Sequence, residues 1–156
     1  MGSRLICALT ILSVFCLTAC TKIVSKPTMV PSRVEVMQES IRSYLGTPYR
    51  LGGSSHDGID CSGLVMRVYQ TIGLDLPRST WEQLGVGKRV GLHEIRFGDV
   101  LFFKNPRKGE RGTSLHAGIF MEDSRFVHAS KSRGVIIDSF DDGWRGLFME
   151  ARRFLE

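Results

Sequence analysis

The order of hydrophobic patterns along the chain is the strongest constraint on its fold. In the first half, apolar residues recur at helical spacing over residues 34–45 and again over 61–72. The second half holds short segments rich in β-branched and aromatic residues, separated by clusters of turn residues. These strands are expected at residues 99–103, 115–121, 125–129, 135–140 and 148–154. N-terminal helices packed on an antiparallel sheet of about five strands predict an α+β fold.

Local signals at the start of each helical segment support this assignment. Ser32 is a suitable N-cap for the first helix, and Glu35 three residues later completes a capping box. Asp60 is a suitable N-cap for the second helix, so Cys61 is expected in its first turn. A further short helix is expected within residues 76–84.

The first 19 residues have the features of a targeting segment. Residues 5–17 are apolar apart from two hydroxyl side chains, but about 20 Å of helix is too short for the roughly 30 Å core of a bilayer. The segment ends in residues 17–20 (LTAC), which resemble a bacterial lipobox. We therefore expect a signal peptide over residues 1–19, cleavage before Cys20 and a lipid on that cysteine, with a plain secretory signal as the alternative.

One globular domain is expected after this leader. Residues 20–33 contain two prolines and no helical period, so they predict a tether from the lipid to a domain spanning residues 34–156. The formal net charge is +5, but the basic residues form no stripe interleaved with aromatic residues. We therefore expect no nucleic-acid partner. We expect a monomer anchored in the cell envelope by its lipid, at the outer membrane facing the periplasm, because Thr21 after the lipidated cysteine resembles outer-membrane lipoproteins.

Cys61 is the one cysteine that signal cleavage and lipidation leave free. An exported protein with a single free thiol forms no internal disulfide, so Cys61 is a candidate nucleophile, with an inert buried cysteine as the alternative. Its place in the first turn of a helix favours the reactive thiol, because the unpaired N–H groups and the helix dipole there stabilise a thiolate. We therefore expect the pKa of the Cys61 thiol to be lowered.

A nucleophilic cysteine requires a base, and four histidines are available. His56 and His93 fall in polar connections and are expected to be solvated. His116 and His128 flank a predicted hairpin with its turn at residues 122–124. In that register the two imidazoles share one face as diagonal neighbours within about 7 Å, whereas a shift of one residue would separate them.

These positions together predict a Cys–His–His triad. His116 would take the proton of Cys61 and later give it to the leaving amine, while His128 orients the His116 ring. The alternatives are a pair of structural histidines and a zinc site formed by the same three residues. The zinc site is disfavoured because the three ligands lack a closely spaced pair. We therefore expect no metal and no cofactor.

Six ordered sequence blocks resemble the NlpC/p60 family of cell-wall cysteine peptidases. They are residues 47–53 (TPYRLGG), 60–65 (DCSGLV), 76–79 (LPRS), 97–103 (FGDVLFF), 116–120 (HAGIF) and 126–129 (FVHA). The resemblance extends from residue 34 to the C-terminus. It implies a papain-like fold and a peptidase that cuts amide bonds in the stem peptides or cross-links of bacterial peptidoglycan.

The resemblance also implies roles for individual residues. The family's nucleophile, base and third polar residue fall on Cys61, His116 and His128. Tyr49 falls at a tyrosine that helps to hold the oxyanion or the substrate. Asp60 and Ser62 fall at positions that bind the polar end of a stem peptide. One departure is Leu51, which stands where an aromatic residue is common.

Two other functions remain open for the same fold. One is a non-catalytic peptidoglycan-binding lipoprotein, although such a module needs no matched thiol and base. The other is an acyltransferase, which differs from a hydrolase only in the acceptor of the acyl group. Motif spacing also leaves the scissile bond open between a D,D cross-link, an L-Ala–γ-D-Glu bond and a γ-D-Glu–diamino acid bond.

Overall fold

The computed structural model describes residues 30–104 and 115–155. The expected signal peptide, the expected lipidation site Cys20 and most of the expected tether therefore lie outside the described residues. Within the described part of the chain, no helix is both long enough and apolar enough to cross a membrane.

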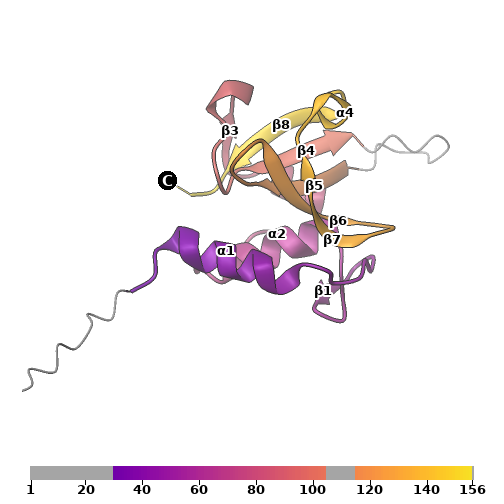
Figure 1. Cartoon of the computed structure of the whole chain (residues 1–156). Helices are drawn as coiled ribbons and strands as arrows, with labels where there is room; N and C mark the ends of the chain where they lie inside the picture. The colour runs from indigo at the N-terminus through magenta and orange to yellow at the C-terminus, as the bar shows by residue number, and fades with distance from the viewer. Residues whose placement is uncertain (1–29, 105–114, 156) are drawn as a thin grey trace, which may run out of the picture.

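Two helices cover one face of a central antiparallel sheet (Figure 1). They are α1 (Arg33–Tyr44) and α2 (Cys61–Gln70), which lie beneath the sheet in this view. The sheet has six strands in the order β3-β8-β4-β5-β6-β7. Their bounds are Lys88–Val90 for β3, Val100–Lys104 for β4, Leu115–Phe120 for β5, Arg125–Ser130 for β6, Gly134–Ser139 for β7 and Phe148–Arg153 for β8. The predicted α+β fold is confirmed.

The remaining elements are short. They are the hairpin of β1 (Ser54–Ser55) and β2 (Gly58–Ile59), the helices α3 (Thr80–Leu84) and α4 (Asp142–Arg145), and a 3₁₀ helix (Leu92–Glu94). The sequence predicts about five strands in the sheet, and β3 is a sixth strand that was not predicted. With only three residues, β3 is too short to give a period-two pattern, and its pairing with β8 is not a local contact.

Both long helices begin where the capping signals predict. The side chain of Ser32 accepts a hydrogen bond from the N–H of Glu35, and the Glu35 carboxylate accepts one from the N–H of Ser32. Asp60 caps α2 by accepting a hydrogen bond from the N–H of Gly63 at 2.8 Å. These contacts satisfy N–H groups that a helix start leaves without partners. The cap formed by Asp60 fixes Cys61 in the first turn of α2.

The sheet separates two apolar clusters. The cluster between the sheet and the helices includes Met37, Ile41, Leu64, Val68, Ala117 and Ala129. The cluster on the opposite face is largely aromatic and includes Phe103, Phe126 and Phe140, with Trp144 of α4 packed against it. Successive strand residues point to opposite faces, so His116 and His128, which neighbour Ala117 and Ala129, face the aromatic cluster.

The helical pattern placed two residues incorrectly on the buried face of α1. Val34 and Leu45 are each 42% exposed, although the apolar period of the sequence includes both. The buried residues of α1 are Met37, Ser40, Ile41 and Tyr44. The contact of α1 with α2 and the sheet is therefore confined to its central and C-terminal turns.

Candidate active site

The hairpin of β5 and β6 brings the two candidate histidines together. Ile119 pairs with Val127, which is the register that the sequence predicts. Nε2 of His116 lies 2.8 Å from Nδ1 of His128, and the ring centroids are 4.9 Å apart with the rings nearly perpendicular. The prediction that these two imidazoles meet on one face is confirmed.

Aromatic side chains enclose this histidine pair. The Trp144 ring lies 5.8 Å from the His116 ring and 5.0 Å from the His128 ring, and Phe126 stacks on His128 at 4.9 Å. Burial, with smaller contributions from His128 and Lys131, lowers the pKa of His116 to about 3. Burial also lowers the pKa of His128. Both imidazoles are therefore neutral at pH 7.

Cys61 opens α2 and lies against β5. The backbone N–H of Ala117, the residue after His116, donates a hydrogen bond to its sulfur, and Oγ1 of Thr80 lies 3.7 Å from Sγ. The place of Cys61 at a helix start predicts a lowered thiol pKa, and this prediction is wrong. Cys61 is 8% exposed, and burial raises the pKa of its thiol more than the hydrogen bonds from Ala117 and Thr80 lower it. The resting site therefore holds a neutral thiol and a neutral imidazole.

Asp60 fixes the loop that leads into α2. Its Oδ1 accepts a hydrogen bond from the N–H of Gly63 and its Oδ2 from the N–H of Gly52. Arg78 binds both carboxylate oxygens at 2.9 and 2.8 Å and also donates to Oγ of Ser62 at 2.9 Å. Burial raises the pKa of Asp60, but the hydrogen bonds from Arg78 and the two N–H groups outweigh it, so the pKa is lowered. The expected contacts of Asp60 and Ser62 with a stem peptide stay a prediction.

Tyr49 lies beside the same loop. It forms an isolated parallel bridge with Ile59, two residues before Cys61, and its half-buried ring packs against the main apolar cluster. Nζ of Lys131 lies 5.9 Å from the centroid of the Tyr49 ring. This position next to the start of α2 is compatible with the expected role at the oxyanion, which stays a prediction.

A cleft of about 390 Å³ opens beside the histidine pair. His116, His128 and Trp144 form part of its lining, together with the cationic side chains of Lys104 and Lys131. An extended substrate that entered this cleft would therefore pass the imidazoles and meet positive charge. In the described part of the chain, no group of three or more His, Cys, Asp or Glu side chains is arranged to hold a metal ion.

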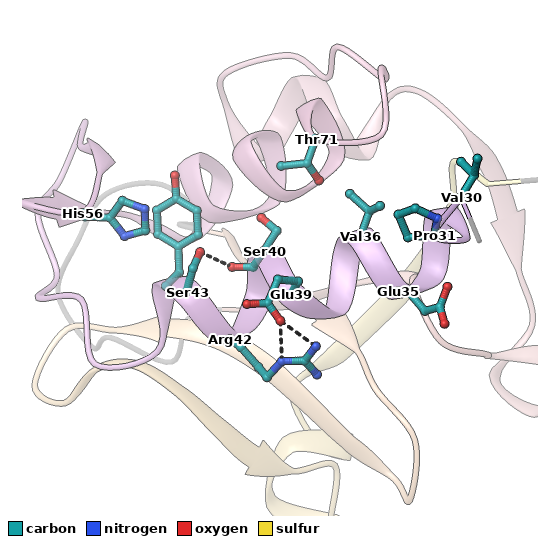
Figure 2. A pocket seen from close by; sticks show the side chains of 11 residues that line it. Val30, Pro31, Glu35, Val36, Glu39, Ser40, Arg42, Ser43, His56 and Thr71 are labelled. Atoms are coloured by element: carbon teal, nitrogen blue, oxygen red, sulfur yellow. Dashed lines mark hydrogen bonds and ion pairs between the residues drawn. The ribbon is translucent and has the colours of Figure 1, made fainter. Parts of the chain in front are cut away.

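A larger groove of about 880 Å³ runs along α1, away from these residues (Figure 2). Val30 and Pro31 lie at one end of the groove and His56 lies at the other. His56 stacks on Tyr44 with 4.1 Å between ring centroids. Both His56 and His93 are exposed, as predicted. None of the candidate catalytic residues lines this groove.

Asp138 is a site residue that was not predicted from the sequence, and it lies directly behind the histidine pair. Its Oδ2 is 3.0 Å from Nε2 of His128, and Arg133 binds its two oxygens at 3.1 and 2.7 Å. Asp138 of β7 pairs with Phe126 of β6 and therefore shares a sheet face with His128. The sequence does contain a signal for this position. With a tight turn after β6, the alternation of side chains along a strand places residue 138 on the same face as His128.

Comparison with known proteins gives concordant matches. Residues 46–153 match the model of the NlpC/P60 family. The chain is 44% identical over 128 residues to the "Murein DD-endopeptidase MepS/Murein LD-carboxypeptidase" of Escherichia coli K12, covering 81% of this chain and 64% of that protein. It is also 44% identical over 124 residues to the "Gamma-DL-glutamyl hydrolase" of Bacillus subtilis, covering 78% of this chain and 29% of that protein.

Solved structures agree with the sequence matches. The crystal structure of an NlpC/P60 family protein from Bacillus cereus aligns with a TM-score of 0.71 and 27% identity. The alignment covers 81% of this chain and 41% of that chain. The chain therefore spans less than two thirds of the length of each of these three proteins.

Proposed function

Because the chain belongs to the NlpC/P60 family, we propose that it is a cysteine peptidase that hydrolyses amide bonds in the peptides of bacterial peptidoglycan. The observation that carries the proposal is the contact between the start of α2 and β5. There the sulfur of Cys61 accepts a hydrogen bond from the N–H of Ala117, and the adjacent His116 is paired with His128. A module that only binds the cell wall has no need of a thiol held against the strand that carries a paired imidazole.

In the proposed reaction, His116 acts first as a base and then as an acid. Its Nε2 faces His128, so Nδ1 is the nitrogen that takes the proton of Cys61 as the sulfur attacks the substrate carbonyl. The tetrahedral intermediate then collapses, the C–N bond breaks, and the leaving amine takes the proton from His116. Water, deprotonated by the same nitrogen, hydrolyses the thioester and restores the thiol.

Burial of the Cys61 thiol and of the His116 imidazole determines when charge develops in the reaction. The pKa of the Cys61 thiol is raised and the pKa of His116 is lowered, both by burial. A stable thiolate–imidazolium pair is therefore disfavoured before substrate binds, and the proton moves together with the attack of sulfur on the carbonyl. The negative charge then lies on the substrate oxygen. We assign its stabilisation to backbone N–H groups in the first turn of α2 and to the phenol of Tyr49.

The surroundings of the pair fit acidic peptides. Lys104 and Lys131 line the cleft next to His116, and ammonium groups there suit the carboxylates that stem peptides carry. Asp60 and Ser62 are proposed to hold the polar end of the substrate on the other side of the nucleophile. Arg78, which binds both of them in this structure, would then share them with the substrate.

Digestion of purified peptidoglycan sacculi tests the proposal and identifies the bond. We expect the protein to release soluble fragments with one new amine and one new carboxylate per cut, because hydrolysis adds water across an amide. Mass spectrometry of the fragments distinguishes cleavage of a D,D cross-link from cleavage of an L-Ala–γ-D-Glu bond or a γ-D-Glu–diamino acid bond.

The other candidate functions give different results in this digest. A binding module would sediment with the sacculi and release no fragment. An acyltransferase would release fragments only when an amine acceptor was added, and their mass would include that acceptor. Either pattern would overturn the proposed hydrolysis.

We further propose that the protein is lipidated on Cys20 and held at the outer membrane, facing the periplasm. Residues 17–20 (LTAC) support lipidation on Cys20, and Thr21 after it supports the outer membrane. We expect the wild-type protein to float with outer membranes on a density gradient, with a mass that includes the lipid. Cys20→Ser should lose the lipid, because serine offers no thiol to modify, and should leave the membrane or accumulate as the uncleaved precursor.

Cys16→Ser is the matched control, because the same substitution inside the apolar segment leaves residues 17–20 intact. It should be lipidated and sorted like the wild type. A Cys20→Ser protein that is cleaved, lacks lipid and still floats with the membrane would overturn the lipid anchor.

A further inference from the structure

Asp138 terminates a chain of hydrogen bonds that leads to the candidate base. Its Oδ2 lies 3.0 Å from Nε2 of His128, and Nδ1 of His128 lies 2.8 Å from Nε2 of His116. This chain of hydrogen bonds thus crosses three strands, from β7 through β6 to β5. Only Nδ1 of His116 is left outside it.

The chemistry of a carboxylate fixes where each proton lies in this chain of hydrogen bonds. An ionised Asp138 only accepts hydrogen bonds, so Nε2 of His128 must carry a hydrogen. Nδ1 of the neutral His128 is then an acceptor, and Nε2 of His116 must donate to it. Nδ1 of the neutral His116 is consequently left unprotonated, which is the form that accepts a proton from a thiol.

The surroundings of Asp138 keep it ionised. The Arg133 guanidinium binds both carboxylate oxygens, at 3.1 and 2.7 Å. Burial raises the pKa of Asp138, but the hydrogen bonds from Arg133 and His128 outweigh it, so the pKa is lowered. Lys131 is the other cation that acts on the histidine pair, and it disfavours a positive charge on His116.

We propose that Asp138 is a positioning residue that sets the tautomers of both histidines and so keeps Nδ1 of His116 free to take the Cys61 proton. The catalytic part of this inference rests on the proposed function. Asp138 itself does not touch the nucleophile or the substrate in the proposed reaction; it acts through His128. Without the carboxylate, His128 can place its proton on Nδ1, which drives the His116 proton onto the nitrogen that the thiol needs.

Asp138→Leu removes the acceptor while keeping a side chain of similar size. We expect kcat for muropeptide cleavage to fall by about 10²–10³-fold with KM changed by less than about threefold, because the wrong imidazole tautomer blocks a chemical step and not binding. Asp138→Asn should recover part of this loss. The amide oxygen can still accept from Nε2 of His128, although the amide nitrogen no longer suits Arg133.

Glu150→Leu is the matched control. Glu150 is also a strand carboxylate held by an arginine, and its side chain is 17% exposed against 18% for Asp138. Among the described residues, Glu150 forms no hydrogen bond with His116 or His128, whereas Asp138 is hydrogen-bonded to His128. We expect kcat of this variant to equal that of the wild type, and thermal unfolding of all variants confirms that they remain folded.

Nitrogen-15 chemical shifts of the histidine rings test the tautomers without any substrate. In the wild type, Nδ1 should be the unprotonated nitrogen of both His116 and His128, and in Asp138→Leu the unprotonated nitrogen should change to Nε2. Wild-type shifts that place the proton on Nδ1 of His116, or shifts that stay the same in Asp138→Leu, would overturn the inference. Unchanged kcat in Asp138→Leu would overturn it as well.

The two readouts separate this inference from the proposed function. If the wild type cleaves no peptidoglycan amide but the tautomers change in Asp138→Leu, the proposed function fails and the assignment of the tautomers to Asp138 stands. If the wild type cleaves and neither kcat nor the ring shifts respond to Asp138→Leu, the function stands and Asp138 only joins β7 to β6.

Discussion

Cys61→Ser is expected to lower the turnover of purified muropeptides by at least about 10³-fold. Serine keeps nearly the same size and should preserve the packing at the start of α2. A hydroxyl is a much poorer nucleophile than a thiol in a site where the base is a buried imidazole with a pKa lowered to about 3. Fragment release measured by liquid chromatography, with the free energy of unfolding measured in parallel, separates lost chemistry from lost folding.

His116→Ala should lose nearly as much, because the nucleophile and its base act as one unit. The Cys61→Ser/His116→Ala double variant should therefore be little worse than either single variant. His93→Ala is the matched control, since His93 is exposed and belongs to the 3₁₀ helix, which carries none of the proposed catalytic residues. We expect this control to retain wild-type turnover.

His128→Ala should cost less than either of these changes. His128 orients the His116 ring through the 2.8 Å hydrogen bond, and a water molecule can take over part of that role. If His128→Ala is as active as the wild type, His128 is structural and the catalytic unit is a Cys–His pair. If all variants bind muropeptides alike and the wild type cleaves none, the chain is a binding module.

The parts of this fold that local chemistry determines could be predicted from the sequence. The capping box of Ser32 and Glu35, the N-cap Asp60 and the hairpin register that joins His116 to His128 each depend on residues close together in the chain. Period two and the turn after residue 121 suffice to place the two imidazoles on one face.

The parts that depend on distant contacts could not be predicted in the same way. The helix start suggested a lowered pKa for Cys61, but burial of the thiol raises its pKa and outweighs the hydrogen bonds from Ala117 and Thr80. Arg78 reaches Asp60 across 18 residues of sequence, and no periodic pattern indicates such a contact. Asp138 is different, because a tight turn after β6 together with strand alternation would have placed it on the same face as His128.

Gly63→Ala is expected to destabilise the fold by about 3 kcal/mol, measured by urea unfolding. A methyl group at residue 63 would lie 2.4 Å from the carbonyl oxygen of Gly53 and 3.0 Å from Oδ1 of Asp60. Neither neighbour can move freely. The Gly53 carbonyl accepts hydrogen bonds from the N–H of Asp60 and from Arg78, and the Asp60 carboxylate caps α2.

Gly85→Ala is the matched control for this change. Gly85 also lies at a helix end, with φ −77, and a methyl group there would meet its nearest neighbour at an ordinary 3.4 Å. Its free energy of unfolding should stay within about 0.5 kcal/mol of the wild type. A Gly63→Ala protein that is as stable and as active as the wild type would show that the close approach of α2 to the Gly53 carbonyl is dispensable. A destabilised protein with lost turnover would instead show that residues 47–53 hold α2, and with it Cys61, against the strand that carries the base.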